Sequence, residues 1–195
     1  QSEGQFVSLG IFEKDDVLCA LRYLEQDVGT SSVGVWGRSM GAVVSLLVAG
    51  DEEFRDSLGC VVCDSPYVSV RLLLLQLAHK YIPKVPFLPY DSVVEEAMTS
   101  IRAAVLTKAG FDLFALDSLP AATNSRAPAL FAHARSDQLV AVSHSHTLVE
   151  AYGGAASLVN FDGDHNSVRD AEFVRTAIHR NTLQHSNILQ HTATQ

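Results

Sequence analysis

The stretch VGVWGRSMGAVV, residues 33–44, places a serine between two glycines where one apolar pattern changes to another. Before it, residues 33–36 are β-branched or aromatic apart from one glycine, which is typical of a short buried strand. After it, residues 42–49 are apolar at nearly every position, which is typical of a buried helix. Ser39 is therefore predicted to lie at a strand-to-helix turn.

The two glycines favour a tight turn in which Ser39 is a nucleophile. Gly37 and Gly41 are predicted to lie where strand and helix approach closely, so that a Cβ atom would clash at either position. The turn would strain Ser39, lift its hydroxyl above the sheet, and place the Met40 N–H at the helix N-terminus, where it can stabilise an oxyanion. The alternative is an ordinary tight turn of an α/β domain.

Strand and helix patterns alternate along the chain, which predicts an α/β fold built on a parallel sheet with helices on both faces. With 195 residues, of which 47% are hydrophobic, the chain can bury one substantial core. We expect a single domain at 1–180 and a C-terminal tail at 181–195. The sheet is expected to have about four strands, at residues 33–36, 58–64, 127–134 and 155–162. The flanking helices are expected at 13–27, 42–49, 142–152 and 168–180.

The segment of residues 67–110 interrupts this alternation with two helical patterns and no strand pattern. The helices are expected at 69–82 and 91–110, and the sequence PKVPFLP between them fixes a bent, non-helical connection. The segment is either a helical cap inserted over the serine turn or a longer crossover connection. Its apolar side chains would line an acyl-binding pocket or serve as core packing. The candidates for that pocket are Tyr67, Leu72 and Phe87.

A nucleophilic serine requires a base to take its proton and a carboxylate to orient that base. Asp137 follows the strand expected at 127–134, and His165 follows the strand expected at 155–162. Because the carboxyl ends of parallel strands meet at one edge of the sheet, both side chains are predicted to lie near Ser39. The order serine, aspartate, histidine is that of the nucleophile-elbow hydrolases and differs from the chymotrypsin and subtilisin orders.

Three other carboxylates compete with Asp137 for the role of the acid. Asp64 also follows a strand end, and it is the second candidate. Asp162 and Asp164 lie too close in sequence to His165 to orient its ring from the far side. Asp137 is therefore preferred, with Asp64 as the alternative.

The other polar side chains near these strands are expected to have supporting or solvated positions. His133 lies inside a strand and is expected in the core or beside the site. His144 and His146 begin a helix and point about 200° apart, so they are poor joint metal ligands and are expected to be solvated. Arg38 would steer an anionic substrate group or, as we expect, pair with a neighbouring carboxylate.

Four motifs in this order resemble the α/β-hydrolase superfamily, specifically its branch of serine-aminopeptidase-like hydrolases and cytosolic esterases or acyl-protein thioesterases. They are GRSMG, CDSP, ARSDQLV and FDGDHNS, and together they cover most of residues 1–179. The resemblance implies a partial α/β-hydrolase fold with Ser39 as nucleophile, Asp137 as acid, His165 as base and Met40 as one oxyanion donor. It implies a cytoplasmic enzyme that requires neither a cofactor nor a metal.

The chain begins at Gln1 in what resembles the middle of a loop, so we expect the start of the protein to be missing. Members of this superfamily begin with further strands and with a loop whose backbone N–H is the second oxyanion donor. The sequence SEGQFVSLG resembles the segment that follows that loop. The visible strands would be the last four of eight, and the strand at 33–36 would become an exposed apolar edge.

Composition argues against several classes of function. The net charge of −8 and the scattered lysines and arginines argue against a nucleic-acid surface. No apolar run reaches the roughly 18 residues that a membrane span requires. Cys60 and Cys63 are spaced to point to opposite faces of a strand and cannot easily share a metal, so the cysteines are expected to be buried, reduced thiols.

These features predict a serine hydrolase that cleaves an ester, thioester or amide bond through an acyl-enzyme on Ser39. The expected partner is a small-molecule or acyl substrate. If that substrate is lipid-like, the protein would make peripheral contact with it. A serine peptidase that uses the same residues is a variant of this prediction. The alternative is a catalytically silent fragment or binding remnant that keeps the fold.

Overall fold

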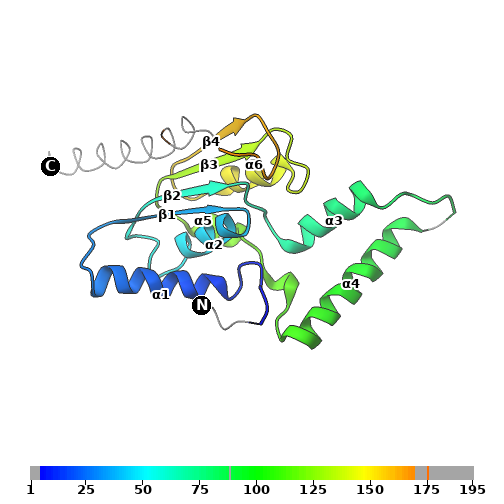
Figure 1. Cartoon of the computed structure of the whole chain (residues 1–195), viewed down its shortest axis with the longest axis horizontal. Helices are drawn as coiled ribbons and strands as arrows, with labels where there is room; N and C mark the ends of the chain where they lie inside the picture. Colours follow the sequence, from blue (N-terminus) through cyan, green and yellow to red (C-terminus); the bar gives the residue numbers. More distant parts are fainter. Residues whose placement is uncertain (1–4, 88, 170–174, 176–195) are drawn as a thin grey trace.

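The computed structural model describes residues 5–87, 89–169 and 175. In these residues four strands form one parallel sheet in the order β1-β2-β3-β4 (Figure 1). The strands are β1 (Val33–Arg38), β2 (Leu58–Asp64), β3 (Ala129–Ala134) and β4 (Ala156–Phe161). The predicted α/β class and the predicted positions of all four strands are confirmed.

Helices α2 and α6 pack against the sheet, α2 on β1 and β2 and α6 on β3 and β4. The side chains of Val61, Phe131 and Leu148 belong to the large core cluster on this face. The sequence patterns missed α5 and the 3-10 helix η1. The helices are α1 (Glu13–Gln26), α2 (Met40–Ala49), α3 (Val70–Tyr81), α4 (Tyr90–Ala109), η1 (Leu113–Ala115), α5 (Leu119–Asn124) and α6 (Val142–Ala151).

The opposite face of the sheet carries a smaller apolar cluster in which Val62 and Leu130 are buried. Nearly all of the helix predicted at 168–180 lies outside the described residues, and so does the tail predicted at 181–195. The prediction that helices cover both faces is therefore confirmed only for the face that contacts α2 and α6.

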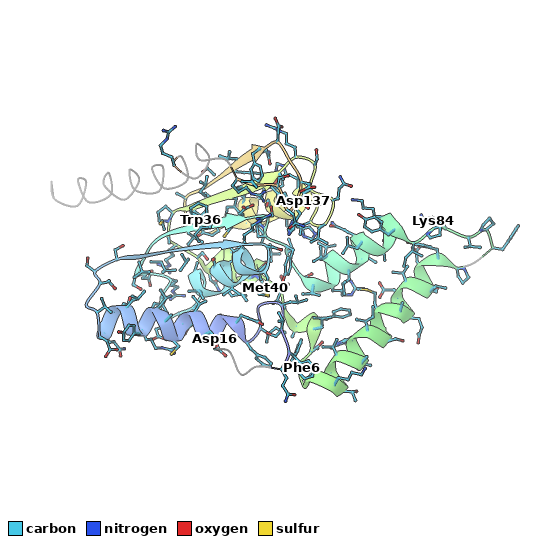
Figure 2. The ribbon with its side chains drawn as sticks, viewed as in Figure 1. Phe6, Asp16, Trp36, Met40, Lys84 and Asp137 are labelled. Carbon is cyan, nitrogen blue, oxygen red and sulfur yellow. The ribbon has the colours of Figure 1, made fainter. Side chains whose placement is uncertain are left out.

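Strand β1 forms one edge of the described sheet, as expected. Its side chains alternate, so that Val35 is buried in the main core whereas Trp36 on the other face is 44% exposed (Figure 2). Among the described residues, the backbone of β1 pairs with β2 and with no other strand. In this part of the chain, the other edge of β1 therefore has no partner strand, and Trp36 of β1 presents an exposed indole.

Helices α3 and α4 form a hairpin that extends away from the sheet (Figure 1). The Ser69 side chain caps α3 by accepting a hydrogen bond from the Leu72 N–H at 3.2 Å. An ion pair of 2.7 Å between Arg71 and Glu95 joins the two helices. Gly110 ends α4 at a φ of 76°, a left-handed conformation that glycine adopts without strain. The base of the hairpin is buried, and Val70 and Phe111 belong to a second core cluster there.

The structure tests two predictions made from composition, that the cysteines are buried and that no segment is apolar enough to span a membrane. Cys63 is buried, and burial raises the pKa of its thiol, whereas Cys60 is half-buried and Cys19 is exposed. The expectation of buried cysteines is therefore wrong for Cys19, which lies on the solvent face of α1. None of the helices that the structure describes is long and apolar enough to cross a membrane.

Candidate active site

Ser39 lies between the last residue of β1 and the first residue of α2, as predicted. Its φ of 53° and ψ of −117° place a non-glycine residue at positive φ, which costs conformational energy. The Ser39 N–H donates to the Asp64 carbonyl oxygen at 2.8 Å, which anchors the turn to the end of β2. Met40 begins α2, so its N–H has no acceptor within the helix.

The close approach of strand and helix depends on one of the two glycines. A Cβ atom on Gly37 would lie 1.9 Å from the Gly41 carbonyl oxygen, so no side chain fits there. A Cβ atom on Gly41 would meet nothing within 4 Å. The prediction of a clash is therefore confirmed for Gly37 and wrong for Gly41. The backbone of Gly41 limits the space at Gly37, but the Cα atom of Gly41 itself faces open space.

Asp137 and His165 follow the carboxyl ends of β3 and β4, and the structure brings both to Ser39. The Nε2 atom of His165 lies 3.0 Å from Oγ of Ser39, and its Nδ1 atom lies 2.7 Å from Oδ2 of Asp137. A carboxylate only accepts hydrogen bonds, so Nδ1 carries the proton and Nε2 presents a lone pair to the serine hydroxyl. The three side chains form one continuous chain of hydrogen bonds.

The Asp137 carboxylate is enclosed by donors. Its Oδ1 atom accepts from the N–H groups of Leu139 at 2.9 Å and Val140 at 2.8 Å. Burial alone would raise the pKa of Asp137, but the hydrogen bonds from His133, His165 and these two N–H groups outweigh burial and hold the pKa well below its ordinary value. Asp137 is therefore an anion that can stabilise a protonated His165.

His133 is fully buried beneath this carboxylate, which confirms that it is a core residue beside the site. Its Nε2 atom lies 2.9 Å from the Val140 carbonyl oxygen and 3.4 Å from Oδ2 of Asp137. Its Nδ1 atom lies 2.7 Å from Oγ of Ser145. Both groups that face Nε2 are acceptors, so the proton lies on Nε2 and the Ser145 hydroxyl donates to Nδ1.

His144 is buried, so the expectation that it is solvated is wrong, whereas His146 is exposed as expected. The Val68 N–H donates to Nδ1 of His144 at 3.1 Å, and Nε2 donates to Oε1 of Gln76 at 2.7 Å. Burial lowers the pKa of His144 to about 4, with a further lowering by His133. This side chain ties α6 to α3.

The rival carboxylates have other partners. Asp64 is buried in an ion pair with Arg169, whose Nε atom lies 2.8 Å from Oδ2. Asp162 lies on the surface opposite Arg135, with 3.4 Å between the closest charged atoms. Asp164 accepts from the Asn166 N–H at 2.9 Å within its own loop. In the part of the chain that the structure describes, the hydrogen bonds of the His165 ring go to Asp137 and Ser39 and to none of these three carboxylates.

Arg38 does not pair with a carboxylate in the described part of the chain, so that expectation is wrong. Its guanidinium instead donates to the backbone carbonyl oxygen of His165. Arg169 reaches the same oxygen at 3.4 Å. Arg38 thus holds the histidine loop against the end of β1, and Arg169 links the same loop to Asp64 at the end of β2, although neither contact leaves a signal in the sequence.

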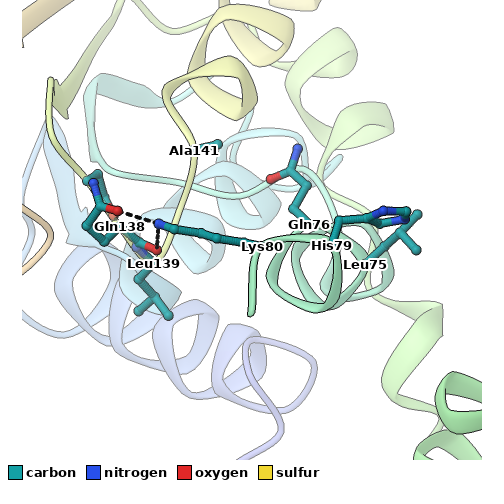
Figure 3. A pocket seen from close by; sticks show the side chains of 8 residues that line it. Leu75, Gln76, His79, Lys80, Gln138, Leu139 and Ala141 are labelled. Atoms are coloured by element: carbon teal, nitrogen blue, oxygen red, sulfur yellow. Dashed lines mark hydrogen bonds between the residues drawn. The ribbon is translucent and has the colours of Figure 1, made fainter. Parts of the chain in front are cut away.

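A pocket of about 440 Å³ lies between α3 and the loop that follows β3 (Figure 3). Lys80 reaches across it from α3 and donates to the carbonyl oxygen of Gln138 at 2.9 Å and to its Oε1 atom at 2.5 Å. Neither Lys80 nor Gln138 belongs to a motif that predicts a position in the site. The lining residues are Leu75, Gln76, His79, Lys80, Asp137, Gln138, Leu139 and Ala141.

The three side chains predicted to form a substrate pocket lie elsewhere. Tyr67 is buried, and its hydroxyl donates to the Leu9 carbonyl oxygen at 2.7 Å. Leu72 lies on the partly exposed face of α3, and Phe87 is fully exposed. None of the three lines the pocket between α3 and the loop after β3, and Tyr67 belongs to the second core cluster, so a role of these side chains in substrate binding stays a prediction. In the described residues, no group of three or more His, Cys, Asp or Glu side chains could hold a metal ion.

Comparisons with known proteins identify the fold. No family model matches the sequence. The uncharacterized protein YqkD of Bacillus subtilis is 28% identical over 169 residues, which cover 85% of this chain and 52% of YqkD, so the chain spans about half the length of this relative. The esterase Pf2001 of Pyrococcus furiosus superposes with a TM-score of 0.59 at 21% identity, over 96% of this chain and 64% of the esterase. An esterase domain of a Rhodothermus marinus protein superposes with a TM-score of 0.58 at 19% identity, over 91% of this chain and 70% of that domain.

These similarities show that the chain has the α/β-hydrolase fold, and that it spans part of the length of such proteins. In this fold the carboxyl edge of the sheet is the place where a strand-to-helix turn presents a nucleophile. Ser39, Asp137 and His165 all lie at that edge in this chain.

Proposed function

We propose that this chain belongs to a serine hydrolase that cleaves an ester bond through an acyl-enzyme on Ser39. The observation that carries the proposal is the continuous hydrogen-bond chain, 3.0 Å from Ser39 to His165 and 2.7 Å from His165 to Asp137. A strained serine at a helix N-terminus supports the same role, because its hydroxyl and the following N–H can act on one carbonyl group.

The reaction follows from these positions. The Ser39 Oγ atom attacks the substrate carbonyl carbon while Nε2 of His165 takes the hydroxyl proton. The oxygen of the tetrahedral intermediate gains a negative charge and accepts a hydrogen bond from the Met40 N–H. The His165 proton then passes to the leaving alcohol, and the bond to that alcohol breaks. Water, deprotonated by His165, then attacks the acyl carbon; the bond from that carbon to Ser39 Oγ breaks, His165 returns the proton to Oγ, and the acid leaves.

Asp137 acts on this reaction through His165. Its anionic carboxylate holds the ring with Nδ1 protonated and stabilises the imidazolium that forms in each half-reaction. Its low pKa keeps it charged at neutral pH. Ester cleavage is preferred over thioester or amide cleavage because solved structures with this fold include esterases of Pyrococcus furiosus and Rhodothermus marinus. A peptidase would use the same residues.

The test is labelling with a fluorophosphonate probe, which reacts only with an activated serine. We expect one covalent adduct on Ser39, detected by intact mass and peptide mapping, together with hydrolysis of short-chain p-nitrophenyl esters. Ser39→Ala should abolish both. The matched control is Ser136→Ala, because Ser136 is an exposed serine in the loop that precedes Asp137. A folded chain that neither labels nor turns over would favour a catalytically silent protein instead.

A further inference from the structure

The connection between α3 and α4 exposes apolar side chains. Among the described residues between 79 and 87, every one is exposed. Tyr81 is 63% exposed, Ile82 46%, Val85 53%, and Phe87 is fully exposed. Scattered apolar side chains are ordinary on protein surfaces, but four within seven consecutive residues form a local patch.

The charge of this region is opposite to that of the chain. Residues 79–90, around the connection, contain Lys80 and Lys84 and no aspartate or glutamate, although the whole chain has a net charge of −8. Lys80 lies 5.1 Å from the ring centroid of Tyr81, and Lys84 lies 5.4 Å from that of Tyr90. The ammonium groups thus accompany aromatic side chains at this end of the hairpin, and Figure 2 shows Lys84 on the stretch beyond α3.

The conformation of the connection holds these side chains outward. Pro83 and Pro86 fix φ at their own positions and cannot donate backbone hydrogen bonds. Phe87 adopts a φ of 66°, which is unfavourable for a bulky residue, and its ring contacts little of the protein. Because the two prolines already restrict the backbone, the connection loses less conformational freedom when it binds a surface.

We propose that this hairpin tip, defined as Tyr81, Ile82, Lys84, Val85 and Phe87, binds an anionic lipid surface. Exposed aromatic and aliphatic side chains enter the boundary between headgroups and acyl chains, and nearby lysines attract anionic headgroups. Pairing of the tip with a second copy of itself is disfavoured, because it would bring the Lys84 side chains of the two copies together.

The position of the tip relates it to the site. Lys80 and the Tyr81 hydroxyl both reach the carbonyl oxygen of Gln138, which neighbours Asp137 in the pocket lining. A surface-bound hairpin would bring lipid-like esters close to that pocket. This consequence rests on the proposed hydrolase function, whereas lipid binding itself does not.

The experiment is cosedimentation of the full chain with phosphatidylcholine vesicles that contain or lack phosphatidylserine. We expect binding only to the anionic vesicles, and weaker binding at high salt. Val85→Ser combined with Phe87→Ser should weaken partitioning at least about tenfold, and Lys84→Gln about fivefold. Val28→Ser and Lys108→Gln are the matched controls, because both side chains are exposed away from the tip. Circular dichroism verifies that each variant is folded.

Binding should persist in Ser39→Ala, which separates lipid binding from catalysis. Three results would overturn the proposal: no sedimentation with either vesicle, equal binding to both vesicles, or equal binding by tip and control variants. A fourth is a dimer in analytical ultracentrifugation that Val85→Ser with Phe87→Ser converts to monomer without any change in vesicle binding, because the tip would then be a contact between copies.

Discussion

The Nε2 atom of His133 lies 3.4 Å from Oδ2 of Asp137, the same oxygen that lies 2.7 Å from Nδ1 of His165. Two imidazole rings from different parts of the chain thus converge on one carboxylate oxygen. Because His133 also faces the Val140 carbonyl oxygen at 2.9 Å, its position is fixed on both sides. We infer that His133 is a positioning residue that orients Asp137 and keeps it ionised.

Replacement of His133 should separate this role from simple packing. His133→Phe fills a similar volume but cannot donate to Asp137, so we expect kcat to fall roughly tenfold or more with little change in KM. His133→Gln keeps a donor and an acceptor and should recover most of kcat. Steady-state kinetics with a p-nitrophenyl ester give both values, and melting curves verify folding. Equal losses in the two variants would indicate packing alone.

Asp137 and Asp64 should respond differently to the same change. Asp137→Asn should lower kcat by about 10⁴, because the amide favours the wrong His165 tautomer. Asp64→Asn breaks a buried ion pair with Arg169 and should lower stability by about 3 to 5 kcal/mol while the folded fraction remains active. Turnover and denaturant unfolding of both variants test this. If Asp137→Asn lowered kcat only slightly while a folded Asp64→Asn variant was inactive, Asp64 would be identified as the acid.

Members of the hydrogen-bond chain should act as a unit. Ser39→Ala and His165→Ala should each lower kcat by several orders of magnitude, and the double variant should be little worse than either, because His165 has no proton to take once the hydroxyl is absent. Single-turnover rates on an activated ester provide the comparison. Independent, multiplicative losses would mean that His165 does not act through Ser39.

The sequence identifies those parts of the site that depend on strand order. Asp137 and His165 each follow an apolar strand, and parallel strands end at one edge, so their convergence on Ser39 follows from topology. Gly37 is identified in the same way, because a serine turn between strand and helix brings the two backbones together. Such features depend on local pattern and connectivity, which a single sequence records.

Other contacts depend on how elements pack, and the sequence does not record them. His144 lies at the start of α6, where a polar side chain is expected to be solvated, but it is buried and hydrogen-bonds to Gln76 of α3. Arg38 donates to the backbone carbonyl oxygen of His165. Every residue has such a carbonyl group, so the sequence does not indicate which one an arginine will contact. Phe87 resembles a core residue in the sequence and is fully exposed, because the hairpin carries it away from the sheet.

Buried His144 should make stability depend on pH. Burial lowers its pKa from 6.5 to about 4, so between these values the unfolded chain binds a proton that the folded chain does not. The free energy of unfolding should therefore fall by up to about 3 kcal/mol as pH decreases from 6.5 to 4. Urea unfolding across this range measures the decrease. His144→Asn should flatten it, whereas His146→Asn, on an exposed side chain, should leave it unchanged.

The two glycines of the serine turn should differ sharply when each is replaced by alanine. A Cβ atom at Gly37 would lie 1.9 Å from a backbone oxygen and 2.5 Å from the Ala42 nitrogen, so β1 and α2 would have to separate. We expect Gly37→Ala to lose more than about 4 kcal/mol of stability. Gly41→Ala has open space and lies in a helix, where alanine is favoured over glycine by up to about 1 kcal/mol. Urea unfolding of the two variants measures the difference, and equal midpoints would show that strand and helix do not approach at Gly37.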